Sequence, residues 1–360
     1  MTHAYLHIGR GKTGTSAIQY FLHDHRKELA AQSIFVPTTP GAVRHAMLSL
    51  YAKADHKLEG LPQWRRLGQR FENPTAMRAF LARELPAEIE TARADSIVLS
   101  DEALFTVNQG PVLRILPPSV QKITFIAYLR RQDERLFSSY KQRVRAHGET
   151  RTLCDWLKSV LRGVPDYRRL TRLVRDYPQH EVIVRPYNRR SFNAESVIYD
   201  FNSIIGSPVA EDMIRTRNGA INASLDAYAT EWLRRRNVKH GTAPDELQRQ
   251  LTALSDGPDL TLPHEEIVSI FKRYKRSNQR LVHKFVPDRG EYLLSEPTAR
   301  AGVLQEDITD EEVRRVGRRV QELQRASGVG RETVWADSPA VHTAGGICDI
   351  TAAGLPFRFL

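Results

Sequence analysis

The chain has 360 residues, with 53 Lys and Arg against 42 Asp and Glu, which gives a net charge of +11. This length can bury a substantial core, as one large domain or a domain with an appendage, and the positive excess favours anionic partners. Only Cys154 and Cys348 are present, which excludes a disulfide framework and a cysteine-rich metal site. No zinc-finger spacing, RNP-like aromatic string or basic-zipper heptad occurs, so specific nucleic-acid recognition is not expected.

The N-terminus enters a strand pattern almost at once, without a basic n-region, an apolar h-region and a cleavage site. No apolar stretch approaches the length of a membrane span. We therefore expect a cytoplasmic protein without a transmembrane segment. A homo-oligomer is compatible with the sequence but not specified by it.

The first informative segment covers residues 4–29, which read as a strand over 4–8, the loop RGKTGTS and a helix over 15–31. Gly9, Gly11 and Gly14 allow a tight turn. A helix that begins near Thr15 directs its free N–H groups and its positive dipole end back into the loop. Lys12 adds a full charge, so the segment predicts an anion cradle suited to phosphate.

The loop does not fit the phosphate-binding pattern GxxxxGK[ST], because Leu6 stands where the first glycine is required. Instead, KTGTS at 12–16 resembles the 5′-phosphosulfate loop of sulfotransferases that use 3′-phosphoadenosine 5′-phosphosulfate (PAPS) as sulfate donor. A plain strand-to-helix turn with one lysine is the alternative. The resemblance implies that the donor is bound by Arg10, Gly11, Lys12, Thr13, Gly14, Thr15 and Ser16.

Between residues 37 and 95 the apolar residues are scattered among Pro, Gly and charges, with helical stretches expected at 43–54 and 75–85. We interpret this region as a substrate-facing insertion. The strand SIVLS at 96–100 follows it and leads into SDEALF.

A second motif begins with the buried strand pattern at 122–129 and continues into a basic helix over 133–147. In sulfotransferases, an arginine at the end of the corresponding strand and a serine eight residues later bind the donor's 3′-phosphate. Arg130 and Ser138 keep that spacing. A solvated basic helix face is the alternative.

Further along the chain, residues 151–177 read as an amphipathic helix and 181–185 as another strand. NASL at 222–225 resembles an element near the nucleotide in bacterial sulfotransferases, although Asn222 and Ser224 also suit a helix N-cap. The interleaved strands and helices predict an α/β fold with a P-loop-like parallel sheet flanked by helices on both faces.

The resemblance covers residues 4–290, so we expect a sulfotransferase-like α/β domain over 1–290. Residues 291–360 would form a helical appendage or a partly disordered tail. Thr309 and Glu312 make a capping box for a helix that runs through Gln324.

The resemblance implies transfer of a sulfuryl group to a hydroxyl or amine of an acceptor, such as a glycan or glycolipid precursor, without a metal. Lys12 would stabilise the departing phosphate. Two residues are candidates for the base that accepts the acceptor's proton. His45 resembles a recurring histidine of the bacterial branch but could be one of twelve histidines on a helix surface. Glu102 follows a strand end but could be a helix cap.

Relatives that use a glutamate base carry it on the helix after the first loop, where this sequence has Gln19. Their mechanism cannot simply be transferred. Two other functions stay open. An ATP-dependent kinase with an atypical phosphate loop could use Asp101 for magnesium. A non-catalytic anion- or nucleotide-binding module would keep the loop without a functional base.

Overall fold

The computed structural model describes residues 1–9, 11–67, 69–161, 167–188, 192, 196–208 and 224–326. Arg10, Asn222 and the expected tail beyond residue 326 lie outside these ranges. The chain divides into two compact units. Unit 1 comprises Met1–Arg130, Tyr167–Ile221 and Ser277–Leu293, and unit 2 comprises Arg131–Asp166, Asn222–Arg276 and Leu294–Leu360.

Unit 1 contains a five-stranded parallel sheet in the order β2-β3-β1-β4-β5. This sheet confirms the predicted α/β fold class. Its strands are β1 (Thr2–His7), β2 (Ile34–Phe35), β3 (Ser96–Ser100), β4 (Val120–Leu129) and β5 (Glu181–Pro186). Its helices are α1 (Thr15–Asp24), α2 (Arg26–Ala30), α3 (Ala46–Tyr51), α4 (Pro62–Leu67), α5 (Pro74–Ala92), α6 (Gly110–Arg114), α9 (Arg168–Asp176) and α10 (Val197–Ile205).

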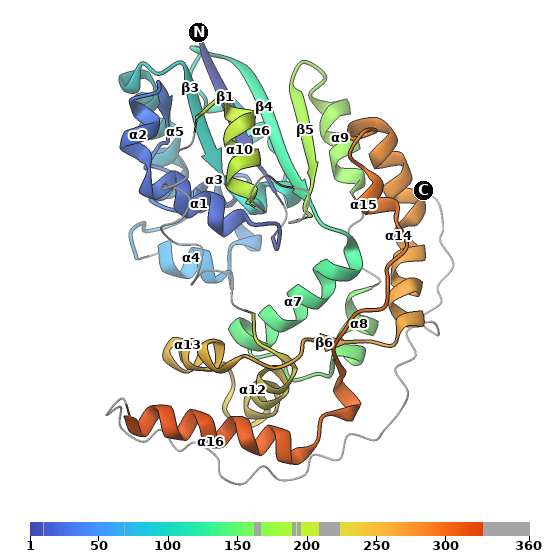
Figure 1. The fold of residues 1–360 in the computed structure, drawn as a ribbon. Helices are drawn as coiled ribbons and strands as arrows, with labels where there is room; N and C mark the ends of the chain where they lie inside the picture. The colour runs from blue at the N-terminus through green and yellow to red at the C-terminus, as the bar shows by residue number, and fades with distance from the viewer. Residues whose placement is uncertain are drawn as a thin grey trace. The chain divides into compact units, whose positions relative to one another are not determined.

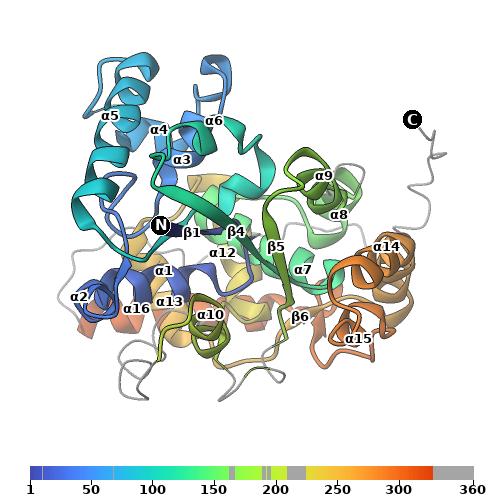
Figure 2. The same ribbon diagram turned by 90° about the horizontal axis from the view of Figure 1, so that it is seen from above.

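Helices cover both faces of this sheet (Figures 1 and 2). On one face, α1, α2 and α10 pack over β3 and β4 around a hydrophobic cluster that includes Ile18, Phe21, Ile126 and Phe201. On the other face lie α5, α6 and α9. The sheet is therefore buried on both sides, as the nearly continuous apolar sequence of β4 requires.

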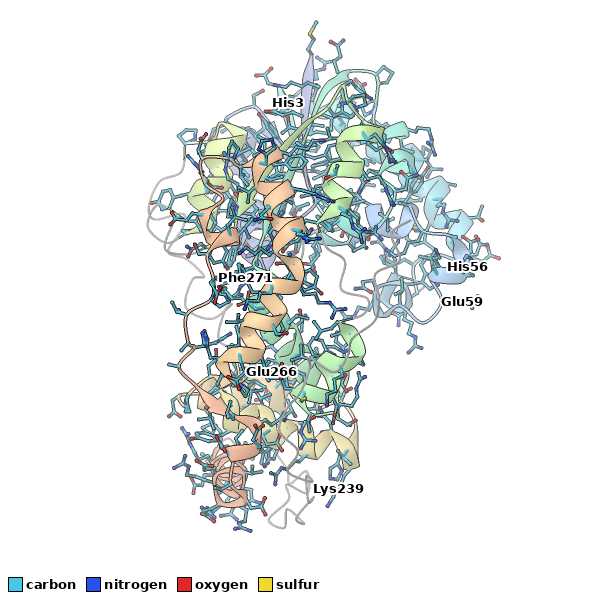
Figure 3. The ribbon with its side chains drawn as sticks, turned by 90° about the vertical axis from the view of Figure 1, so that its right-hand side faces the viewer. His3, His56, Glu59, Lys239, Glu266 and Phe271 are labelled. Atoms are coloured by element: carbon cyan, nitrogen blue, oxygen red, sulfur yellow. The ribbon has the colours of Figure 1, made fainter. Side chains whose placement is uncertain are left out.

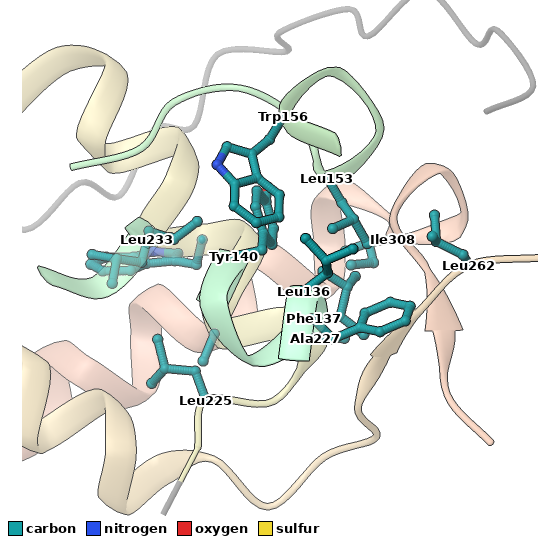
Figure 4. Close-up of a cluster of buried hydrophobic side chains, with 14 of the residues drawn as sticks. Leu136, Phe137, Tyr140, Leu153, Trp156, Leu225, Ala227, Leu233, Leu262 and Ile308 are labelled. Atoms are coloured by element: carbon teal, nitrogen blue, oxygen red, sulfur yellow. The ribbon is translucent and has the colours of Figure 1, made fainter. Parts of the chain in front are cut away.

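Unit 2 is built around a separate hydrophobic cluster (Figure 4). Tyr140 and Trp156 pack together there with ring centroids 5.6 Å apart, and Leu233 is fully buried. The elements of this unit are α7 (Gln132–His147), α8 (Leu153–Val160), α12 (Ala227–His240), α13 (Asp245–Leu254), β6 (Leu260–Thr261), β7 (Val303–Leu304) and α16 (Asp310–Ala326). Along the sequence, α14 (His264–Phe285) and α15 (Glu291–Leu294) extend across the ranges of both units.

The division into units differs from the boundary at residue 290 expected from the sequence. The reason is that a compact unit forms around a shared hydrophobic core, and distant parts of the chain can contribute to one core. Residues of α7, α8, α12 and α16 share one hydrophobic cluster although they are far apart in the chain. The capping box of α16 is confirmed, because Thr309 N donates to Glu312 Oε2 at 2.8 Å and Glu312 N donates to Thr309 Oγ1 at 3.3 Å.

Two predicted helices are divided in the structure. The helix expected over 15–31 is interrupted at His25, between α1 and α2. Next to this break, the Arg26 side chain donates hydrogen bonds to the carbonyls of Val36 and Ala42. These are long-range bonds that no local pattern predicts. The stretch 151–177 contains α8 and α9, with residues 162–166 between them outside the described part.

Candidate functional site at the carboxyl end of the sheet

The loop after β1 leaves the sheet at a topological switch point. From β1 the chain proceeds to β2 and β3 on one side, whereas from the neighbouring β4 it proceeds to β5 on the other side. In open parallel sheets, the crevice at such a point is where ligands bind. The fold therefore places Lys12 and Arg130, which follow β1 and β4, at the same edge of the sheet.

Two of the described loop residues have left-handed backbone, Lys12 with φ 78° and Gly14 with φ 76°. Gly14 is the N-cap residue of α1 and has no room for a side chain. A Cβ there would lie 2.8 Å from Cγ1 of Val197 and 2.9 Å from Cε2 of Tyr187. The tight turn allows α1 to begin at Thr15, so its first N–H groups face the loop and can receive an anion.

Tyr187 is a residue of this site that the sequence interpretation missed. It follows β5, its N–H donates to the carbonyl of Leu129 at 2.6 Å, and its ring contacts the Gly14 position. The guanidinium carbon of Arg130 lies 5.9 Å from the centroid of the same ring. Tyr187 therefore fills the space between the start of α1 and Arg130, and its place just after a strand end was the available signal.

Glu102 lies beside the loop. A Cβ on Gly11 would be 3.4 Å from Oε2 of Glu102. Burial raises the pKa of the Glu102 carboxyl above its ordinary range, while the positive charges of Arg44 and Lys12 act in the opposite direction. The nearby hydroxyl of Thr15 also acts to lower this pKa. A carboxyl with a raised pKa next to an anion cradle is suited to general-base chemistry.

The helix cap at this position is Asp101 and not Glu102. Asp101 is the N-cap of the 3-10 helix Glu102–Thr106, since its Oδ1 accepts the N–H of Ala103 at 2.9 Å. Its Oδ2 accepts the N–H of Ser49 at 2.8 Å, and the residue is 4% exposed. With both oxygens engaged by backbone donors, Asp101 acts as a structural cap, which weakens the magnesium-dependent kinase alternative.

His45 does not lie on a helix surface. It is 1% exposed, and its Nδ1 accepts the N–H of Ser100 at 3.0 Å. Burial lowers the pKa of His45 to about 4, and the charge of Arg26 acts in the same direction. The backbone of Pro37 acts to raise the pKa of His45, but this effect is small beside that of burial. Since the backbone N–H of His45 also donates to the Ser100 carbonyl at 3.1 Å, this histidine tethers its segment to the end of β3.

Beneath the loop lies a buried polar layer centred on Ser100. Gln19 donates to the Ser100 carbonyl at 3.3 Å, and Nδ1 of His7 lies 2.8 Å from the Ser100 hydroxyl. A Cβ on Gly9 would lie 2.6 Å from Nε2 of His7, so His7 sits directly under the loop. Gln19 thus braces the β3 end that carries Glu102, and no pattern in the sequence indicated this role for His7.

For the remaining predicted residues of the donor site, the structure gives less evidence of a shared position. Thr13 is buried and Ser16 is half-buried in the loop and α1. Arg130 belongs to unit 1 and Ser138 to unit 2, so their pairing stays a prediction. Ser224 is exposed, and Asp226 rather than Ser224 caps α12 by accepting the N–H of Ala229 at 2.7 Å. Arg10 and Asn222 lie outside the described residues.

Across the described ranges, no group of three or more His, Cys, Asp or Glu side chains is arranged to hold a metal ion. Among the helices that the structure describes, none is long and apolar enough to cross a membrane.

Comparisons with known proteins give limited similarity. No family model matches the chain. An uncharacterised protein of Archaeoglobus fulgidus is 28% identical over 210 residues, which is 56% of each of the two chains, so the match spans only a little over half the length of that relative. The sulfotransferase domain of the Synechococcus PCC 7002 olefin synthase aligns with 76% of this chain and 94% of its own, at 13% identity and a TM-score of 0.36. At these values the likeness carries no argument about activity.

Proposed function

We propose that this chain is a sulfotransferase that moves a sulfuryl group from PAPS to a hydroxyl or amine of an acceptor, such as a glycan or glycolipid precursor. The observation that carries the proposal is the placement of Glu102 against Gly11, next to the charge of Lys12 and the start of α1. An anion cradle and a partly buried carboxyl then lie side by side, one suited to the donor and the other to the acceptor.

Each residue has a distinct task in this proposal. The backbone N–H groups at Thr13–Ser16 and the hydroxyls of Thr13 and Ser16 hold the donor's 5′ end, and Arg130 and Ser138 bind its 3′-phosphate. The acceptor oxygen forms a bond to sulfur while the bond from sulfur to the bridging phosphate oxygen breaks. Glu102 takes the acceptor's proton, and Lys12 stabilises the charge that develops on the bridging oxygen.

Glu102 is preferred to His45 as the base. A base must reach the acceptor's proton, and Glu102 adjoins the loop that would hold the donor. His45 is buried, and its ring accepts a hydrogen bond from the Ser100 N–H. It therefore serves as a positioning residue in this proposal.

Ligand-induced stabilisation tests the proposal. We expect adenosine 3′,5′-bisphosphate to raise the thermal midpoint, because it binds only the folded state, and ATP with magnesium to have little effect. At a ligand concentration of about 100 times Kd, the stabilisation is roughly 2.7 kcal/mol. The opposite order would favour the kinase. Stabilisation without sulfate transfer to any cellular glycan or lipid extract would favour the non-catalytic module.

The pH profile tests the base. Glu102 accepts a proton only when ionised, so the transfer rate should rise with pH through the raised pKa of this carboxyl. We expect Glu102→Gln to lower the rate roughly 100- to 10,000-fold and to abolish this acidic limb. Measured rates from acidic to neutral pH test this, with His45→Gln as control. A limb that persists in Glu102→Gln and disappears in His45→Gln would reverse the assignment.

A further inference from the structure

Helix α14, after its first turn, has an unusual charge composition. Residues 267–287 contain six Lys and Arg, one His, and no Asp or Glu. The cations are Lys272, Arg273, Lys275, Arg276, Arg280 and Lys284, and we call them the basic stripe. Six cations and no carboxylate within 21 residues form a dense block of positive charge, which calls for a physical explanation.

The basic stripe lies on the exposed face of α14, because the opposite face of the helix is apolar and buried. All six cations and His283 are exposed, whereas Phe271, Tyr274 and Leu281 are almost completely buried. Figure 3 shows α14 with Glu266 and Phe271 marking its first half. Because the apolar face is fixed in the protein, the cations cannot rotate away from solvent.

None of the six cations forms an ion pair with another described residue. Some cations on other helices do. On α16, for example, Arg314 and Arg318 both pair with Glu311, and Arg319 pairs with Asp256. Within the described ranges, the stripe is thus an excess of positive charge without a compensating carboxylate.

The cations also stand in a row. Lys272, Arg276, Arg280 and Lys284 are spaced four residues apart, which places them on one side of the helix at intervals of about 6 Å. Like charges at this spacing repel one another and weaken a helix. A row of fixed cations along roughly 18 Å is complementary to a linear polyanion lying parallel to the helix.

We propose that the basic stripe binds a linear acidic polysaccharide. This inference rests on the proposed function, because a polysaccharide is a polyanion that also carries acceptor hydroxyls. Single-stranded nucleic acid is disfavoured because the aromatic rings of Phe271 and Tyr274 are buried and cannot stack with bases. A membrane is disfavoured because Met1 and Val238 are the only large hydrophobic side chains exposed among the described residues.

The test measures binding of a fluorescently labelled oligogalacturonate to the full chain at increasing salt. The triple variant Lys272→Glu, Arg276→Glu, Arg280→Glu should bind roughly tenfold or more weakly than the wild type. A milder variant with Gln at the same three positions should show an intermediate loss. The matched control is Lys27→Glu, Lys158→Glu, Arg172→Glu, which removes three exposed cations of α2, α8 and α9 and changes the net charge equally. We expect it to stay within about twofold of the wild type.

Equal losses in the stripe and control variants would overturn the proposal, because net charge alone would then explain binding. Stripe-dependent binding that is tighter for duplex DNA, or for vesicles containing phosphatidylglycerol, would overturn the choice of a polysaccharide. The stabilisation by adenosine 3′,5′-bisphosphate is measured on the same variants and should be unchanged. If that nucleotide fails to stabilise even the wild type, the proposed function is wrong whatever the polysaccharide result.

Discussion

Lys12→Ala is expected to lower the rate of sulfuryl transfer roughly 100- to 1,000-fold, about 3 to 4 kcal/mol of transition-state stabilisation. The reason is that charge develops on the bridging oxygen as the bond to sulfur breaks, and Lys12 is the lysine of the loop that would hold this oxygen. The measurement is transfer of labelled sulfate from PAPS to an extract of cellular glycans and lipids that supports wild-type turnover.

Lys12→Ala removes the charge of the side chain without changing the backbone requirement of the loop. Lys12 has φ 78°, and alanine bears the same left-handed strain as lysine, so the loop backbone is not relaxed by the change. Lys57→Ala, an exposed lysine of a different segment, serves as the matched control. An undiminished rate in Lys12→Ala would exclude the leaving-group role, whereas weaker donor binding at an unchanged maximal rate would reduce Lys12 to a binding residue.

The part of the site that the sequence predicted consists of short-range features. The strand, the glycine turn and the helix start lie within about twenty residues, and local patterns predict such units. Arg130 was placed correctly at a strand end because β4 is a long apolar run. The capping box of α16 was predicted for the same reason, since its two residues are three apart.

The part that the sequence did not predict depends on contacts between distant segments. The contact of Glu102 with Gly11 joins residues 91 positions apart, and the bond from Gln19 to Ser100 joins residues 81 apart. Neither has a periodic signature, because each follows from the strand order. The two-residue β2 was also missed, since two residues are too few for periodicity. The units mix distant ranges because packing, not chain order, assembles their cores.

The burial of His7 under the loop and of His45 at the end of β3 leads to a second expectation with a large effect, a loss of stability in weak acid. Both imidazoles are buried, and burial lowers the pKa of His7 to about 3 and that of His45 to about 4. In the unfolded chain a histidine has a pKa near 6.5. Below that value the unfolded state binds protons that the folded state does not, so the free energy of unfolding falls as the pH falls.

Each histidine contributes roughly 2 kcal/mol to the difference between pH 6.5 and pH 5, because one pKa unit corresponds to about 1.4 kcal/mol. We therefore expect the free energy of unfolding in urea to fall by roughly 4 kcal/mol from neutral pH to pH 5. His45→Gln should remove about half of this pH dependence. His56→Gln, which changes an exposed histidine (Figure 3), should leave it intact. A flat stability profile in the wild type would mean that these two imidazoles are not held neutral in the folded protein. The buried polar layer that positions Glu102 would then need another explanation.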